Sequence, residues 1–200
     1  MDLAQSLARP SIDRTRAENP ASRWPLIESI PQGIKMPALE SGTTAPEIHL
    51  PLLGGGNFAL SEARRHGPVA VAFFKVSCPV CQMAFPFYER LHQAYRGANI
   101  QVVGISQDSA HDTASFAKQF GISFPIALDD TKRYPASNAY GLTNVPTLFL
   151  VSSGGKIEIS SVSWSQDELE AVNQRLAAAA GKDKQKIVQP SDNVPSFKPG

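Results

Sequence analysis

The stretch from Val69 to Cys81 reads VAVAFFKVSCPVC and joins a short apolar run to a pair of cysteines. Its first seven residues, Val69 to Lys75, are almost all small, β-branched or aromatic, which is typical of a strand buried on both faces. From Cys81 to Arg96, apolar residues recur at helical spacing, although a proline lies inside this pattern. The sequence therefore predicts that the cysteine pair lies at a junction between a buried strand and a helix.

Outward from this junction, predicted strands and helices alternate along the chain. The further strands are predicted at 47–53, 57–60, 100–105, 125–128, 147–151 and 156–162. The further helices are predicted at 61–65 with Ser61 as N-cap, at 109–120, at 131–140 with Pro135 as an interruption, and at 165–180 with Ser165 as N-cap. This order predicts an α/β fold with a central mixed sheet flanked by helices on both faces. The two strands around Gly54-Gly55-Gly56 predict an additional N-terminal hairpin.

Three segments are expected from composition. Residues 1–43 contain several prolines that break any long helix, so they are predicted to form a partly ordered arm. Residues 44–181 form the predicted domain. Residues 182–200 are polar and rich in proline, which predicts a disordered tail.

The bulk composition excludes several classes of partner. The chain carries 19 basic and 18 acidic residues and a net charge of +1, which gives no reason to expect nucleic acid or an anionic membrane as partner. No apolar run reaches the roughly 18–20 residues that a membrane-spanning helix needs. The first residues contain no continuous apolar segment of the kind found in secretory signals, so a cytoplasmic location is expected.

The chain has only two cysteines, and two residues separate them. A stabilising framework of disulfides is therefore excluded, and a bridge across so short a loop would add little stability. At a helix N-terminus, unpaired N–H groups and the helix dipole favour a thiolate, which is the nucleophile in disulfide exchange. We expect Cys78 to attack and Cys81, about one turn later, to resolve the mixed disulfide. Pro79 suits the first helical turn, and Val80 adds no charge.

Two simpler interpretations of the cysteines compete with redox chemistry. They could be small core residues, or they could bind zinc. A zinc site needs about four ligands, and the chain's four histidines have no ligand-like spacing to the cysteines: His49, His66, His92 and His111. We therefore predict no metal and no other cofactor.

Several motifs resemble the redoxin branch of the thioredoxin superfamily, which includes the TlpA/ResA-like thiol–disulfide oxidoreductases and the AhpC/TSA peroxiredoxins. The matching motifs, which span about residues 43–180, are Ala45-Pro46-Glu47, Phe73-Phe74, Cys78-Pro79-Val80-Cys81, the run from Gly104 to Asp108, Phe124-Pro125 with Asp129, Tyr140-Gly141, Val145-Pro146-Thr147, and the run from Gly154 to Ile157. The resemblance implies a thioredoxin-like fold and an enzyme that exchanges a dithiol or disulfide with protein or small-molecule thiols.

The resemblance also implies a role for Val145 and Pro146. Pro146 is expected to be cis and to lie beside the cysteine pair, and the backbone of Val145 is expected to pair with an extended segment of the substrate. Taken alone, a proline at the first position of a strand is an ordinary boundary residue.

The chain departs from the pattern of thioredoxin itself: Ser77 replaces a Trp, Pro79-Val80 replaces the central pair, and two further positions bear on the chemistry of the cysteines. The buried acid of thioredoxin lies six residues before the first cysteine, where this chain has Ala72, so a proton acceptor for Cys81 is missing from that place. Lys75 is unusual at the end of a buried strand. It either extends its ammonium group to solvent or helps to hold the Cys78 thiolate by its charge.

Peroxide reduction and a redox-switched binding role are the alternatives. The peroxiredoxin pattern places Thr or Ser three residues before the reactive cysteine, and this chain has Cys78 before Cys81 and Lys75 before Cys78. The pattern also places an arginine near Pro146, and this chain has none between Arg133 and Arg175. Peroxidase activity is therefore the second choice. A binding module that uses the cysteines as a switch would form lasting complexes rather than turn over.

Overall fold

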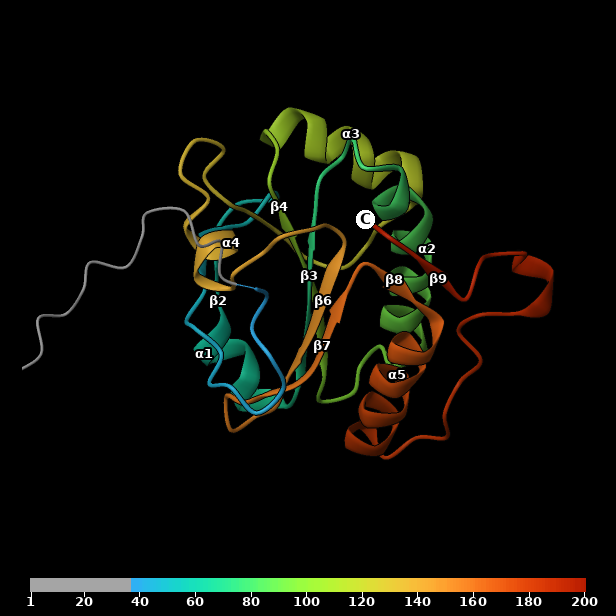
Figure 1. Cartoon of the computed structure of the whole chain (residues 1–200). Coiled ribbons are helices and arrows are strands. Elements are labelled where there is room, and N and C mark those ends of the chain that lie inside the picture. The colour runs from blue at the N-terminus through green and yellow to red at the C-terminus, as the bar shows by residue number, and fades with distance from the viewer. Residues whose placement is uncertain (1–36) are drawn as a thin grey trace, which may run out of the picture. The chain divides into compact units, whose positions relative to one another are not determined.

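The computed structural model of the chain describes residues 37–200 (Figure 1). The expectations for residues 1–36, most of the predicted N-terminal arm, lie outside the described residues. Within the described part, no helix is both long and apolar enough to cross a lipid bilayer.

The central strand of the sheet is β3 (Val69–Phe74), and all six of its side chains are buried. It pairs in parallel with β4 (Gln101–Ser106) and antiparallel with β6 (Thr147–Val151). A strand with a partner on each side and a helical or hairpin layer on each face has no exposed surface, which explains its continuously apolar sequence.

The five-stranded sheet has the order β5-β4-β3-β6-β7. Its outer strands are β5 (Ile126–Leu128), parallel to β4, and β7 (Ile157–Val162), antiparallel to β6. The predicted mixed sheet is therefore confirmed. The N-terminal hairpin is also confirmed, as the antiparallel pair β1 (His49–Pro51) and β2 (Asn57–Ala59).

Alternate residues of β3 contribute to two separate cores. Ala70, Ala72 and Phe74 face α2 (Pro79–Ala94), α3 (Ala110–Phe120) and α5 (Gln166–Ala180). Val69, Val71 and Phe73 belong to the core on the opposite face, which the hairpin covers with α1 (Leu60–Ala63) and α4 (Pro135–Ala139). Figure 1 shows these two groups of helices on either side of the sheet.

Most predicted helix ends are confirmed. Ser109 and Ser165 cap α3 and α5 through their side chains, and Gly121 and Gly181 end these helices in the left-handed conformation. The expected Ser61 cap is wrong. Ala59 is the N-cap of α1, and the backbone N–H of Ser61 donates instead to the Glu47 carboxylate. A 3₁₀ turn (Arg64–His66) follows α1.

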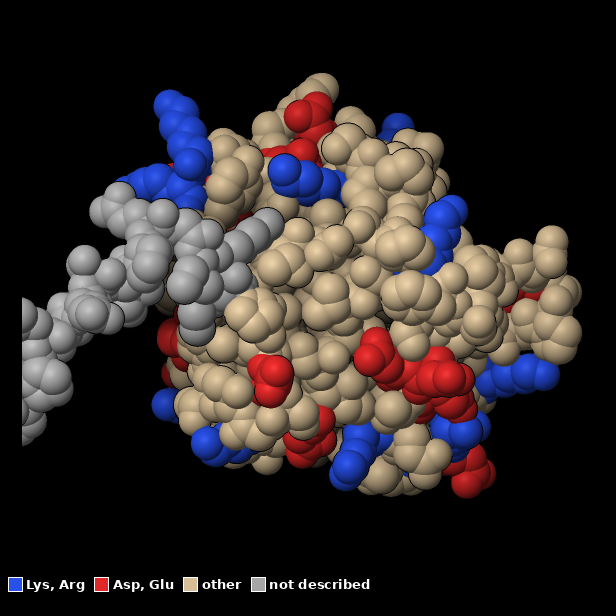
Figure 2. Space-filling model, in the orientation of Figure 1, with Lys and Arg blue, Asp and Glu red and all other residues tan. Residues whose placement is uncertain are grey.

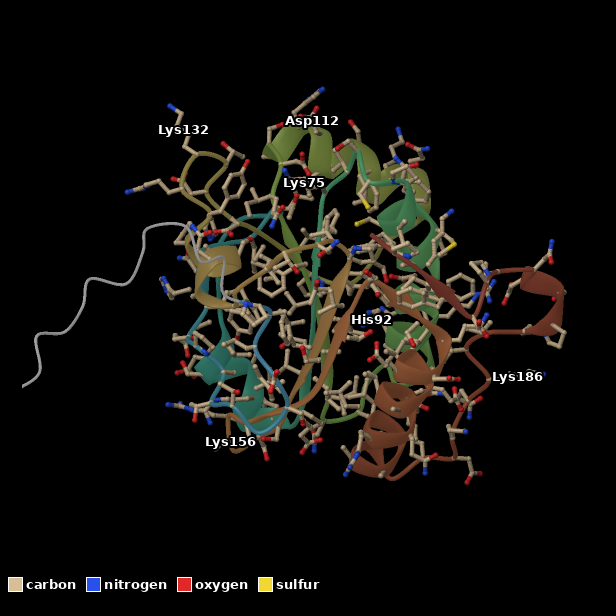
Figure 3. The ribbon with its side chains drawn as sticks, in the orientation of Figure 1. Lys75, His92, Asp112, Lys132, Lys156 and Lys186 are labelled. Carbon is tan, nitrogen blue, oxygen red and sulfur yellow. The ribbon has the colours of Figure 1, made fainter. Side chains whose placement is uncertain are left out.

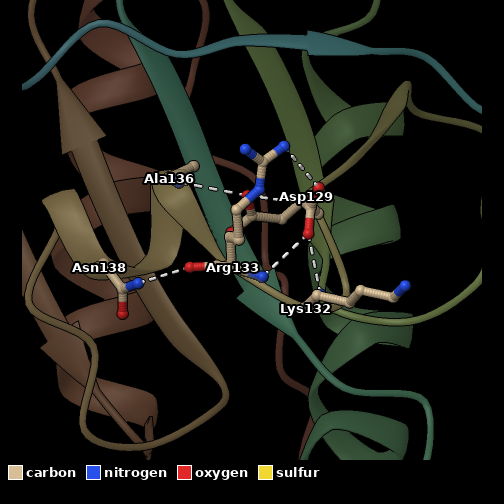
Figure 4. Close-up of polar contacts among 6 residues, drawn as sticks. Asp129, Lys132, Arg133, Ala136 and Asn138 are labelled. Atoms are coloured by element: carbon tan, nitrogen blue, oxygen red, sulfur yellow. Dashed lines mark hydrogen bonds and ion pairs between the residues drawn. The ribbon is translucent and has the colours of Figure 1, made fainter.

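The start of α4 depends on an aspartate outside the helix. Pro135 was expected to interrupt a helical stretch, but it occupies the first turn of α4, where its missing N–H costs nothing. The buried Asp129 carboxylate accepts a hydrogen bond from the backbone N–H of Ala136 (Figure 4) and another from the backbone N–H of Ser137. Asp129 therefore acts as a capping residue for backbone N–H groups that lie seven and eight residues further along the chain.

Residues 182–200 are ordered, against the expectation of a disordered tail. A 3₁₀ turn (Pro190–Asp192) is held to α2 by the ion pair between Arg90 and Asp192, and Ile187 is buried in the α2/α5 core. The strand β9 (Phe197–Lys198) then pairs antiparallel with β8 (Trp164–Ser165). The polar composition hid these contacts because most of them are made by backbone carbonyl groups rather than by apolar side chains.

Candidate functional site

Cys78 is the N-cap residue of α2, directly after the turn that follows β3. Its backbone is extended, and its sulfur accepts a hydrogen bond from the backbone N–H of Cys81 at 3.3 Å. The sulfur therefore lies where the helix dipole and the Cys81 N–H group favour negative charge. This confirms the predicted junction of strand, cysteine pair and helix.

The other motif residues differ in exposure. Pro79 is exposed at the first position of α2, and Val80 is buried in the core beneath it. Cys78 is half-buried, whereas Cys81 is fully buried, and both are free thiols. Only Cys78 is accessible to a disulfide of another molecule.

Burial raises the pKa of the Cys81 thiol well above its ordinary value. A backbone hydrogen bond from Lys75 opposes this rise, while Cys78 and the Asp108 carboxylate add to it. Burial therefore favours the protonated form of Cys81, which distinguishes this thiol from the half-exposed thiol of Cys78.

The loop before Cys78 is held by two polar side chains, those of Asp108 and Gln82, whose roles the sequence did not predict. The Asp108 carboxylate accepts from the backbone N–H of Val76 at 2.8 Å, and the Gln82 side-chain amide donates to the Val76 carbonyl at 2.9 Å. Asp108 lies two residues after the end of β4, and the carboxyl ends of adjacent parallel strands meet at one edge of a sheet. That placement was a signal for Asp108. It also supplies the acid near Cys81 that Ala72 does not.

Val145 and Pro146 lie against Cys78, as the resemblance implies. Their peptide bond is cis, and the Cys78 thiol donates to the Val145 carbonyl at 3.2 Å across 67 positions of sequence. The Pro146 carbonyl accepts from the backbone N–H of Ser163, a residue with a positive φ of 79°. Ser163 was not predicted, and nothing in its sequence context marks it.

Lys75 lies at the end of β3 (Figure 3), and its ammonium group is 5.6 Å from the centre of the Tyr134 ring. Such a cation–π contact is mildly attractive at a partly exposed site. Lys75 also lines a small pocket of about 230 Å³ with five other residues: Gln107, Leu142, Thr143, Asn144 and Val145. That its charge holds the Cys78 thiolate stays a prediction.

Among residues 37–200, no three His, Cys, Asp or Glu side chains come together in a way that could hold a metal ion. All four histidines are described and belong to separate elements: His49 to β1, His66 to the 3₁₀ turn after α1, His92 to α2 and His111 to α3. The arrangement around Cys78 is that of a nucleophilic thiol with a second, buried thiol one turn away.

Comparison with known proteins agrees with this geometry. Residues 41–160 match the AhpC/TSA family. The thiol-disulfide oxidoreductase ResA of Geobacillus thermodenitrificans is 30% identical over 122 residues, which are 60% of this chain and 68% of that protein. ResA of Geobacillus kaustophilus is 27% identical over 135 residues, covering 66% of this chain and 76% of the relative.

A solved structure gives a similar result. A protein from Chlorobium tepidum, assigned as the thiol:disulfide interchange protein DsbE, superposes with a TM-score of 0.63 and 29% identity. The match covers 72% of this chain and the whole of that one.

Proposed function

The chain belongs to the AhpC/TSA family and is a thiol–disulfide oxidoreductase, and we propose that Cys78 and Cys81 form its exchanging dithiol. The observation that carries this assignment is the asymmetry of the pair. One sulfur is half-exposed and caps a helix, and the other is fully buried in the first turn of the same helix. Two core cysteines would both be buried, and a structural bridge would need no exposed sulfur.

In the first step, the Cys78 thiolate attacks one sulfur of an oxidised substrate. A Cys78–substrate disulfide forms, the substrate disulfide breaks, and its other sulfur leaves as a thiolate that takes up a proton. The Cys81 N–H and the N-terminus of α2 stabilise the negative charge on Cys78 before the attack.

In the second step, Cys81 loses its proton and attacks the Cys78 sulfur. The Cys78–Cys81 disulfide forms, the mixed disulfide breaks, and the second substrate thiolate leaves, so two electrons have passed to the substrate. Because burial raises the pKa of Cys81, this step needs a base. We propose the Asp108 carboxylate, directly or through water, as that base. The reverse sequence oxidises a substrate dithiol.

Protein thiols or disulfides are the expected substrates. The Val145 backbone lies beside Cys78, and an extended segment that pairs with it would bring its own disulfide to the sulfur. Lys75 and the pocket beside Val145 would lie along such a segment.

The test is a redox titration with single-cysteine variants. Wild type, Cys78→Ser and Cys81→Ser would be equilibrated in a series of thiol/disulfide buffers, and free thiols and masses measured. Wild type should show one reversible two-electron couple, and only Cys81→Ser should accumulate a stable mixed disulfide. A potential near roughly −270 mV would indicate a reductant, and one near roughly −120 mV an oxidant.

Two results would contradict the assignment. If no internal disulfide forms at any potential, the two sulfurs do not act as a pair. If Cys78→Ser rather than Cys81→Ser accumulates the mixed disulfide, the roles of the two residues are reversed.

Hydroperoxide reduction is the second candidate, because the AhpC/TSA family, to which the chain belongs, includes peroxiredoxins. Against it, the position that should carry a hydroxyl is Lys75, and its ammonium group faces the Tyr134 ring. Stopped-flow mixing of the reduced protein with hydrogen peroxide should therefore give only slow oxidation. The cytoplasmic location stays a prediction, which cell fractionation would check.

A further inference from the structure

The segment from Val194 to Gly200 runs along β8 toward the residues around Cys78. Figure 1 shows this segment (red) passing beside β8 and ending near the start of α2. Three carbonyl groups fasten it: Val194 and Pro195 accept from the Gln166 side-chain amide, Pro195 also accepts from the Trp164 indole N–H at 2.7 Å, and Ser196 accepts from the Gln166 backbone N–H. The pairing of β9 with β8 follows directly.

The end of this segment meets the residues that surround the reactive sulfur. The Gly200 N–H donates to the Ser163 hydroxyl at 3.0 Å, and the Asn144 side-chain amide donates to the Gly200 carbonyl at 2.8 Å. Gly200 approaches Val145 so closely that a Cβ atom would lie 2.1 Å from the Val145 carbonyl oxygen. That oxygen is the acceptor of the Cys78 thiol.

The rest of the domain binds this segment almost entirely through hydrogen bonds to the backbone of the segment. The side chains of Ser196, Phe197 and Lys198 are exposed, Phe197 by 57%, although the backbone beneath them is bonded to β8. In the space-filling view the centre of this face carries few charged side chains, and most of the charge lies toward its rim (Figure 2). A surface of this kind fits an extended, uncharged stretch of polypeptide with a small residue beside Val145.

We propose that this surface, formed by Asn144, Val145 and the run from Ser163 to Gln166, receives the extended segment of a protein disulfide substrate, and that residues 194–200 occupy it in competition. The inference rests on the proposed function, because it concerns access to the same sulfur. Residues 194–200, here called the tail, lie where a substrate segment paired with Val145 would have to lie, so the two cannot bind at the same time.

The tail has an advantage over any free segment. It is joined to the domain by a short, anchored connection, since Arg90 and Asp192 fix the chain immediately before it. A tethered segment experiences an effective concentration of the order of millimolar. Only substrates that bind tightly, or that displace the tail stepwise, would reach Cys78.

Gly200→Ala is the sharpest test, because it places a methyl group against the Val145 carbonyl without altering the catalytic residues. Gly54→Ala is the matched control, since a Cβ there meets no atom within 4 Å. We expect Gly200→Ala to reduce insulin disulfides, with dithiothreitol as electron source, roughly tenfold faster than wild type. Gly54→Ala should equal wild type. The rate of Cys78 with dithiodipyridine, a small disulfide, should change less than about twofold, because it needs no extended surface.

A second variant, ended after Asn193, keeps the Arg90–Asp192 contact and lacks the competing strand. Circular dichroism would first show that it is folded. It should match or exceed Gly200→Ala, and a synthetic peptide of residues 194–200 should inhibit it competitively. Equal insulin rates in wild type and both variants, or no inhibition by the peptide, would overturn the inference.

Failure of this inference and failure of the proposed function give different results. If the proposed function is wrong, no Cys78–Cys81 disulfide forms in wild type, Gly200→Ala or the shortened protein. If only the inference is wrong, all three show the same working couple and the same insulin rate.

Discussion

Two segments that are far apart in the sequence approach the same carbonyl group and are held in place in different ways. The cysteine loop, residues 75–81, and the tail, residues 194–200, both contact the Val145 carbonyl, one through the Cys78 thiol and the other through Gly200. The first is held by a buried strand and a capped helix, and the second by backbone hydrogen bonds to β8. The cysteine loop is thus held between buried elements, whereas residues 194–200 are held at the surface by hydrogen bonds of their backbone.

The largest expected effect comes from comparing a phenylalanine of α2, the helix that Cys78 caps, with a phenylalanine of residues 194–200. Phe85 is fully buried in α2, with ring centres 4.3 Å from Phe74 and 5.3 Å from Phe116. Phe85→Ala should lower the free energy of unfolding by about 3–5 kcal/mol. Phe197→Ala, in the tail, should stay within about 0.5 kcal/mol of wild type. Urea unfolding would measure both, and a large loss from Phe197→Ala would break the comparison.

Asp108 tests how firmly the cysteine loop is held. Asp108→Ala removes the acceptor of the Val76 N–H, and we expect a loss of about 1.5–3 kcal/mol in unfolding free energy. Asp108→Asn keeps an oxygen at that position and should lose less. If Asp108 also acts as base for Cys81, Asp108→Asn should slow the resolving step as well, and quenched-flow trapping of the mixed disulfide would show it. Equal losses in the two variants would contradict the hydrogen-bonding role.

The raised pKa of Cys81 predicts that the free energy of unfolding depends on pH, in a way that does not involve residues 194–200. The unfolded chain releases this proton near pH 9, whereas the folded, reduced protein retains it. Stability from the protonated thiol is therefore complete below about pH 9 and is lost as the pH rises further, by up to about 1.4 kcal/mol per pH unit. Unfolding at pH 8.5–10 would measure it. The disulfide form and Cys81→Ala should both lack this slope.

A substitution at Trp164 tests how firmly the tail is bound to the domain. Trp164→Phe keeps an aromatic ring against Phe87, whose ring centre lies 5.0 Å from that of Trp164, but removes the hydrogen bond to the Pro195 carbonyl. We expect a loss of about 1 kcal/mol in unfolding free energy and faster proteolysis within residues 194–200. If proteolysis is unchanged, the indole hydrogen bond does not hold the tail.

The smallest effect is expected at acid pH. The hydrogen bond from the Arg90 side chain lowers the pKa of Asp192 to about 2. The contribution of this ion pair is therefore complete above the ordinary aspartate pKa and is lost as the pH falls toward 2. The indole N–H resonance of Trp164 should report loosening of the tail below about pH 4. Asp192→Asn should loosen the tail at neutral pH and remove this acid transition.

Much of the fold was predictable because its elements obey local rules. The continuous apolar run Val69–Phe74, the serine caps of α3 and α5 and the glycines that end them are signals carried by neighbouring residues. The expected cap at Ser61 is wrong because the carboxylate of Glu47, 14 residues earlier, accepts from the Ser61 backbone N–H. A cap that depends on tertiary structure leaves no local pattern.

The residues of the site also fall into two groups, those that a local sequence pattern indicates and those whose contacts depend on tertiary structure. Cys78 and Cys81 were predictable from spacing and position, and Val145 and Pro146 only through a resemblance to a family. Asp108 belongs to a motif of the resemblance, but its role was not predicted, because its contact with Val76 depends on the pairing of β3 with β4. The tail was misassigned because composition measures side chains, and the tail is bound mainly through its carbonyl groups.

The strand order has a consequence for synthesis on the ribosome. The strand β3 carries the chain directly into Cys78, yet its antiparallel partner β6 is made much later, after β4, α3, β5 and α4. Long-range pairings of this kind form slowly and leave apolar strands exposed in the nascent chain. In each new molecule there is therefore a period in which both cysteines have been synthesised but Val145 and residues 194–200 have not. During that period the cysteines are an ordinary exposed dithiol, open to any oxidant the cell provides.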